Sequence, residues 1–180
     1  MKIFLLLLLP CISLAQEKGG YATVRGGVSL YKGSNYFTGR VSVGALKNNT
    51  FGIGGGFGLI KFDKPYIPLT IDFTFFGAPD KVTPIIIGQA GYGIYNDNLA
   101  YTTQRGGFTG GFSGGISFPA GKKNKIYITG GISVYSFTTH TQVGGSTKKA
   151  RTSVSHLEIT GGLKFKPLKY TNMESTFFFA

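Results

Sequence analysis

A strict alternation of apolar and small polar residues between Gly106 and Phe137 constrains the fold of this chain more than any other feature. Before the turn at 119–124, the apolar residues share one parity: Phe108, Phe112, Ile116 and Phe118. After the turn they do so again: Ile126, Ile128, Ile132 and Val134. Because successive side chains of a strand point to opposite faces, the pattern predicts an antiparallel hairpin with one apolar and one polar face. Each run is about as long as the 9–11 residues with which a tilted strand crosses a bilayer.

The same alternation recurs along the rest of the chain and predicts eight strands in all. The other six runs are 21–31, 36–46, 51–62, 66–77, 84–96 and 152–166. No segment shows the three- and four-residue apolar spacing of a helix. Pro68 interrupts the fourth run, and Ile85 and Ile87 blur the start of the fifth. The second face of the third run is almost bare backbone and consists of Gly52, Gly54, Gly56 and Gly58.

The amino terminus has the pattern of a secretory signal peptide. Met1-Lys2 precedes a short apolar run, and Ser13-Leu14-Ala15 supplies the small residues of a cleavage site. We expect cleavage after Ala15, a barrel over 16–168 and a tail of uncertain structure over 169–180. The lone cysteine, Cys11, leaves a lipoprotein as an alternative, although Pro10 before it does not fit that pattern. The mature chain then has no cysteine, which excludes disulfides and thiol chemistry.

The apolar parity carries no charged residue in the middle of any run. A soluble sandwich would have to pack such faces on each other and blunt its edges with charge or proline. A closed barrel in lipid fits better, because lipid offers no partner to an unpaired backbone group. We therefore expect an all-β fold, an eight-stranded antiparallel up-and-down transmembrane β-barrel with a packed polar lumen, as a monomer. Aromatic residues near the run ends predict interfacial girdles: Tyr21, Tyr31, Tyr36, Phe51, Tyr66, Tyr95, Tyr101 and Phe118.

Connection lengths predict which end of the barrel faces outward. With the amino terminus taken as periplasmic, the two longest connections, 97–105 and 138–151, lie on the same external side, as in outer-membrane barrels. The second contains Lys148, Lys149 and Arg151, an external loop that we expect to bind anions such as the phosphates of lipopolysaccharide or an acidic polymer. Solvation of a basic loop without specific binding is the alternative.

Four charges lie on the polar parity near the middle of their runs: Arg25, Arg40, Asp72 and Glu158. An eight-stranded barrel is only wide enough for side chains to fill it, and buried charges must be paired. We expect Glu158 to pair with Arg25, and Arg40 to reach Asp72 across the glycine face of the third run. This lumen charge network predicts a plug that stabilises and closes the barrel; a gated conduit or a ligand site is the alternative.

The stretch from Tyr66 to Tyr95, YIPLTIDFTFFGAPDKVTPIIIGQAGYGIY, resembles the central hairpin of the small outer-membrane β-barrel proteins common in Bacteroidetes, often described as porin-family or outer membrane protein β-barrel domain proteins. Glycine-rich strands punctuated by phenylalanine and a leader ending in Ser-Leu-Ala-Gln are similar too. The resemblance implies a barrel in the outer membrane of a Gram-negative envelope and says little about activity. Chains of that family usually stop at an aromatic residue that closes the last strand; this chain departs from that pattern, because fifteen residues follow Phe165.

We expect a structural or interaction role, in envelope integrity, adhesion or surface binding through external loops, and not general diffusion. The alternatives are a small channel or transporter for ions or hydrophobic solutes, a lipid-modifying outer-membrane enzyme, and a secreted soluble β-protein.

Ser155 and His156 point to opposite faces of a strand, which disfavours a hydrolase. Two histidines without cysteine make a poor metal set, and we expect neither metal nor cofactor. The net charge of +12 indicates lipid or polysaccharide partners in preference to nucleic acid; no protein partner is specified.

Overall fold

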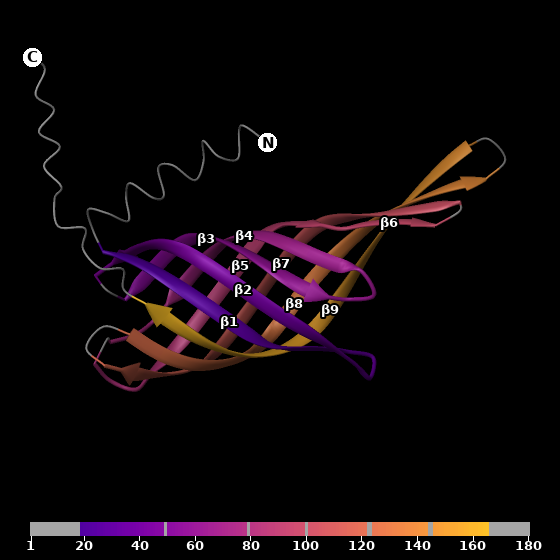
Figure 1. Ribbon diagram of the computed structural model, residues 1–180. Coiled ribbons are helices and arrows are strands. Elements are labelled where there is room, and N and C mark those ends of the chain that lie inside the picture. The colour runs from indigo at the N-terminus through magenta and orange to yellow at the C-terminus, as the bar shows by residue number, and fades with distance from the viewer. Residues whose placement is uncertain are drawn as a thin grey trace, which may run out of the picture.

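The computed structural model describes residues 19–48, 50–78, 80–99, 101–121, 124–143 and 146–165. They form one closed antiparallel sheet (Figure 1). Its strands are β1 (Gly20–Tyr31), β2 (Ser34–Lys47), β3 (Phe51–Lys61), β4 (Pro65–Phe75), β5 (Thr83–Ile94), β6 (Asn96–Leu99), β7 (Thr102–Ala120), β8 (Asn124–Val143) and β9 (Ser146–Phe165). Pairing of β1 with β9 and of β5 with β7 closes the ring. The short β6 follows β5 after Tyr95 and pairs with the first residues of β7, so the ring itself has eight strands. The expected eight-stranded antiparallel barrel is confirmed.

The expected signal peptide, 1–15, and the expected tail, 169–180, lie outside the described residues. We call the end of the barrel where β1 begins and β9 ends the lower end, and the opposite end the upper end. In Figure 1 the lower end is on the left. Within the described ranges, no helix has the length and apolar character needed to cross a membrane.

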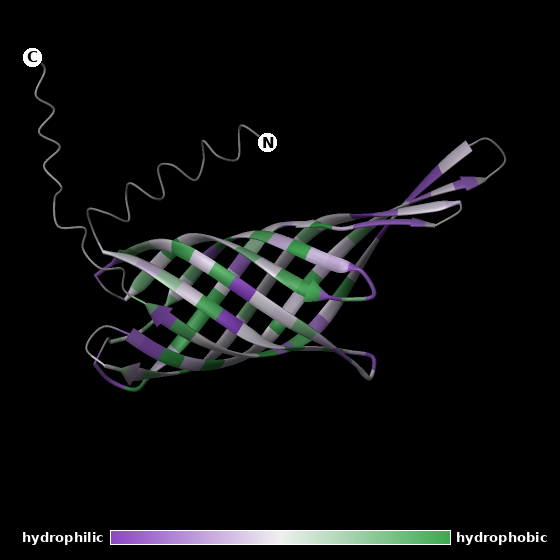
Figure 2. Cartoon of the chain, in the orientation of Figure 1, coloured by the Kyte–Doolittle hydropathy of each residue, from purple (hydrophilic) through white to green (hydrophobic). Residues whose placement is uncertain are grey.

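Hydrophobic and hydrophilic residues alternate along the strands of the ring (Figure 2). The outer wall is apolar because the parity with aliphatic and phenylalanine side chains faces outward. Phe112 and Ile128, for example, are 64% and 59% exposed. On the described outer wall of the ring, charged residues occur only at strand ends, at Lys47 and Lys61. The two irregular runs also follow the parity. Ile86 lies outside, while Ile85 and Ile87 point inward and are almost fully buried.

Pro68 points inward within β4, and the regular pairing of β4 with β3 skips this position. Proline has no N–H to donate to a ladder, which accounts for the break. Pairing with β5 continues there, where Pro68 lies opposite Gly93. The ring therefore stays closed past the proline.

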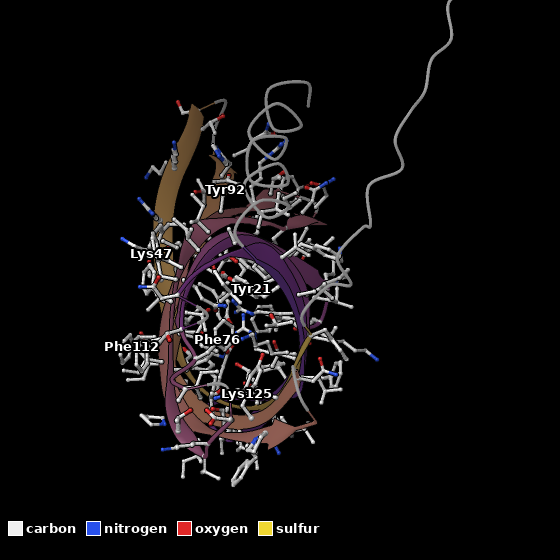
Figure 3. The ribbon with its side chains drawn as sticks, turned by 90° about the vertical axis from the view of Figure 1, so that its left-hand side faces the viewer. Tyr21, Lys47, Phe76, Tyr92, Phe112 and Lys125 are labelled. Atoms are coloured by element: carbon white, nitrogen blue, oxygen red, sulfur yellow. The ribbon has the colours of Figure 1, made fainter. Side chains whose placement is uncertain are left out.

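The expected aromatic girdles are wrong for five of the eight residues named. Tyr21 and Tyr66 are buried in the lumen, and Tyr31, Tyr36 and Tyr95 line its upper mouth. Phe51, Tyr101 and Phe118 are exposed as expected. Figure 3 shows the contrast, with Tyr21 and Phe76 inside the ring of strands and Phe112 outside it. The tyrosines turn inward because they follow the polar parity of their strands.

The two long connections at the upper end are not loops, which corrects that expectation. β7, β8 and β9 run for 19, 20 and 20 residues, and β1 for only 12. Their upper parts pair with one another and with β6 to form a four-stranded extension that projects beyond the ring (Figure 1). Regular strand pairing thus replaces most of segments 97–105 and 138–151.

Candidate functional site

The lumen is filled by three layers of side chains, and the middle layer contains the charges. Arg25 Nη2 donates to Asp72 Oδ2 over 3.3 Å, and both side chains are nearly fully buried. Ser42 Oγ donates to the same carboxylate oxygen over 2.5 Å, and Thr70 Oγ1 donates to Oδ1 over 2.6 Å. Asp72 is therefore held by one cation and two hydroxyls, the satisfaction that a buried carboxylate requires.

A second ion pair completes this layer. Arg40 Nη2 lies 3.6 Å from Glu158 Oε1 and donates to the Tyr135 hydroxyl over 3.0 Å. Arg40 Nη1 donates to Gln89 Oε1, and the Tyr135 hydroxyl donates to Glu158. The groups of this layer come from β1, β2, β4, β5, β8 and β9, and the glycines of β3 leave space for them. Both carboxylates are thus paired with an arginine, while Nε of Arg25, Nε of Arg40 and Nε2 of Gln89 are buried without a hydrogen-bond partner among the described residues.

The pairing is the reverse of the one expected from the sequence. Glu158 was to pair with Arg25, yet it lies opposite Ser29, four residues farther along β1. Arg25 and Arg40 lie directly opposite each other on β1 and β2, so like charge separates their guanidinium groups toward different carboxylates.

The glycine face of β3 provides the room for this layer. A β-carbon on Gly58 would lie 2.7 Å from Arg40 Cγ, and one on Gly56 would lie 2.9 Å from Asp72 Oδ2. Side chains at these positions would collide with the charged groups, so bare backbone is a requirement of the network.

Below the charges, an apolar layer closes the lower end of the lumen. Its members are Tyr21, Leu46, Phe76, Ile85, Ile87 and Tyr127. Two lysines are buried with them. Lys125 Nζ donates to the Phe76 carbonyl, to Thr83 and to Ser117, and Lys164 Nζ lies 4.3 Å from the centre of the Phe76 ring. Figure 3 shows Lys125 within the ring of strands. This layer seals the barrel with packed rings around a Lys125 ammonium that donates three hydrogen bonds.

Above the charges, aromatic side chains form an upper layer and a cup. Ile60, Tyr66 and Tyr135 are its buried centre, packed against Phe62, Tyr95 and Phe137. A cavity of about 260 Å³ lies over them at the upper mouth, with aromatic walls and the polar side chains of Asp63, Gln104, Thr139, Thr152 and His156 at its lining. Burial and the nearby Asp97 raise the pKa of the Tyr95 hydroxyl, which stays neutral at physiological pH. The cup is blind, because the filled lumen lies beneath it.

A serine–histidine pair occurs at the boundary of the upper layer. Ser29 Oγ and His156 Nδ1 are 2.9 Å apart, and the histidine ring stacks on Tyr31 at a centroid distance of 4.7 Å. The Ser29 side chain has no exposed surface, so a substrate carbonyl has no path to its hydroxyl. We interpret the pair as a packing contact that satisfies two buried polar groups.

The expected anion-binding residues of the external loop lie on opposite faces of β9 in the extension. Lys149 and Arg151 lie on one face of β9 and Lys148 on the other, because neighbouring residues of a strand alternate. All three are exposed. The structure therefore does not bring 148, 149 and 151 together as the single basic cluster that the sequence suggested.

Several residues of the lumen site were not predicted from the sequence. Tyr135, Gln89 and Ser42 share the polar parity that located the four charges, so parity could have included them. Lys125 and Lys164 also lie on that parity, but at strand ends, where a lysine is ordinarily expected to reach solvent.

No protein-family model matches the chain, and no curated protein matches it in sequence. Among solved structures, the N-terminal β-barrel domain of Pseudomonas aeruginosa OprF is similar, with a TM-score of 0.55 and 9% identity over 83% of this chain and 98% of that one. A major outer membrane protein from Thermus thermophilus has a TM-score of 0.46 and 15% identity over 82% of this chain and 99% of that one. At such identities, the likeness to the OprF domain shows the barrel fold alone.

Proposed function

We propose that this chain is an integral outer-membrane β-barrel with a closed lumen, whose role is structural or interactional and is performed at its upper, outward-facing end. The observation that carries the proposal is the inverted arrangement of the barrel. Its exposed wall is apolar around the whole ring, and its interior holds two buried ion pairs. Such an outer wall gains free energy in lipid and would be an aggregation hazard in water.

The filled lumen argues against general diffusion. Buried Tyr21, Phe76 and Tyr127 close the lower end, and the paired charges occupy the middle. Eight strands leave room for little else. A small channel would require both layers to rearrange, and removing one partner of a buried pair costs about 3–5 kcal/mol. A lipid-modifying enzyme is disfavoured because the Ser29 hydroxyl is inaccessible.

The test is to refold the protein into phosphatidylcholine vesicles and to measure three properties. We expect a faster-migrating folded band on unheated gels, resistance of the barrel to added protease, and no steady conductance in planar bilayers. Full solubility without detergent would favour a secreted soluble β-protein. Reproducible single-channel steps from the unaltered protein would favour the channel.

A second function, the capture of a small ring-shaped ligand such as a sugar, is favoured by the aromatic cup. Aromatic faces with amide, hydroxyl and carboxylate groups at the rim suit a neutral polar ring, and pockets of this type are mostly apolar with a few placed polar groups. Because the chain has no tryptophan, tyrosine dominates its emission, and three of its ten tyrosines, Tyr31, Tyr36 and Tyr95, line the cup. We expect titration with hexoses to change the emission of the native protein and of Tyr101→Leu, and not that of Tyr95→Leu. An equal change of emission in the native protein and both variants would exclude the cup as the binding site.

A further inference from the structure

The outer face of the extension carries a cluster of cations that the sequence alone does not bring together. Arg105 on β7 and Arg151 on β9 both lie opposite Thr138 of β8, so the three residues form one row across the sheet. Lys149 is two residues from Arg151 on the same face, and it lies opposite His140. At the spacing of strands, the two arginines are about 10 Å apart, and Lys149 is about 7 Å from Arg151.

A β-bulge puts Arg105 on this face. Pairing of β7 with β8 shifts between Gly106 and Thr109, where β7 has one extra residue. Phe108, below the bulge, faces outward, and simple alternation from it would turn Arg105 toward the lumen. The extra residue reverses that parity, so Arg105 faces outward with Thr138. Re-aiming a side chain is a recognised effect of such bulges.

The cluster lies on the same face of β9 as the apolar wall. Lys149 and Arg151 share their parity with Leu157 and Ile159, which are 50% and 52% exposed. Arg151 is six residues from Leu157, which at a strand tilt of about 40° places it roughly 15 Å higher. A phospholipid head-group layer is only about 5–8 Å thick. The cations therefore lie at a level that suits the thicker phosphorylated sugar region of lipopolysaccharide.

Nothing negative competes for these cations among the residues that the structure describes. Asp72 and Glu158 are paired in the lumen, and Asp80 lies at the lower end. Asp97 lies opposite Gln104, on the other face of the extension, and is bound to Lys64. Asp63 lines the cup. Arg105, Lys149 and Arg151 are exposed.

We propose that Arg105, Lys149 and Arg151 form a site on the outer wall of the barrel for the phosphate groups of surrounding lipopolysaccharide. Arginine suits this ligand because its planar fork donates two parallel hydrogen bonds to a phosphate. Lys148, on the opposite face, takes no part. The site rests on the proposed membrane location, and it would hold the barrel in a shell of the lipid that surrounds it.

The test compares two triple variants with the same change of charge. Arg105→Gln, Lys149→Gln and Arg151→Gln together remove the site. Lys47→Gln, Lys81→Gln and Lys148→Gln together remove three exposed lysines at the lower end and on the other face. Each protein is refolded in detergent micelles, checked for the faster-migrating folded band, and titrated with fluorescent lipopolysaccharide and with the same lipid after enzymatic dephosphorylation.

We expect loss of the site to raise the Kd for lipopolysaccharide roughly tenfold or more, given the attraction of each cation near an anionic surface. The control should change it less than about twofold, and dephosphorylated lipid should bind all three proteins equally and weakly. Equal Kd values for the two triple variants, or an unchanged Kd after dephosphorylation, would overturn the site while leaving the membrane location intact. Failure of the native protein to insert into vesicles would instead overturn the proposed function.

Discussion

Asp72 shows how much of the lumen depends on one side chain. It accepts hydrogen bonds from Arg25, Ser42 and Thr70, which come from three different strands. Removing its charge would leave the Arg25 guanidinium buried beside a neutral amide, and an unpaired buried charge is more costly than an apolar replacement of the whole pair.

We predict that Asp72→Asn lowers the free energy of unfolding by about 3 kcal/mol. Urea unfolding in vesicles, followed by the loss of the folded band on unheated gels, measures this. Asp80→Asn at the exposed lower turn is the control and should cost less than about 0.5 kcal/mol.

A double-mutant cycle distinguishes the observed pairing from the reverse one. Arg25→Gln with Asp72→Asn should show a coupling of about 1 kcal/mol or more, within the range of contacting residues. Arg25→Gln with Glu158→Gln should be more nearly additive, since Arg40 is the partner of Glu158. A larger coupling for the second cycle would contradict the structure.

Parity was enough to place all four lumen charges inside, because inward and outward positions alternate strictly in the middle of each strand. It was not enough to pair them. Which charges meet depends on strand register, and register decides that Arg25 faces Arg40 while Glu158 faces Ser29. No short-range signal in a single sequence specifies that register. The inward tyrosines were missed for another reason: Tyr suits both a lipid interface and a lumen.

At the scale of elements, β3 is the strand that shapes the interior by contributing almost no side chain to it. Its inward positions from Gly52 to Gly58 are glycine, and the side chains of Tyr21 from β1, Arg40 from β2 and Asp72 from β4 extend over them. We predict that Gly56→Ala destabilises the barrel by about 1–3 kcal/mol, the usual cost of overpacking. Gly26→Ala on the outer face of β1, where a β-carbon meets nothing within 4 Å, is the matched control and should cost little. Unfolding in urea measures both.

The extension is the second element whose independence can be tested. At the tip of the extension, β8 and β9 pair with each other up to Val143 and Ser146, beyond Thr141, where the pairing of β8 with β7 ends, and the residues from Ser146 to Ser153 are exposed. We predict that replacing 141–148 by Asn-Gly, a favoured two-residue hairpin turn, leaves barrel stability within about 1 kcal/mol. The new turn joins His140 to Lys149, which already lie opposite each other. Loss of the folded band would show that the extension is part of the folding unit.

The sequence anticipated eight strands but not where three of them end. Above the ring, threonine, lysine and arginine replace the outward apolar residues, so the alternation that marked the strands disappears. The bulge between Gly106 and Thr109 could not be predicted either, because one extra residue in a glycine-rich strand has no distinctive sequence pattern.

On the scale of the whole molecule, the barrel is closed by its first and last strands. Every other ladder of the ring joins strands that follow each other along the chain, apart from the interposed β6. Ala22 lies opposite Phe165, so both ends of the barrel segment are at the lower end on neighbouring strands. We predict that a circular permutant, with residues 20 and 165 joined by a flexible linker and new ends at 122–123, folds with the same gel mobility as the native chain. An unfolded permutant would show that the order of strands along the chain, and not the closed ring, determines folding.

The β1–β9 ladder has a consequence for how the barrel is assembled. Hairpins between successive strands form quickly because their ends are close along the chain, whereas Val28 must find Ile159 across almost the whole sequence. Until it does, the backbone groups of two strands remain unpaired, and a lipid interior offers them no partner. In the proposed membrane location, an incomplete chain would therefore be kept at the surface of the bilayer, and the seam between β1 and β9 is where newly made protein would be most exposed to protease.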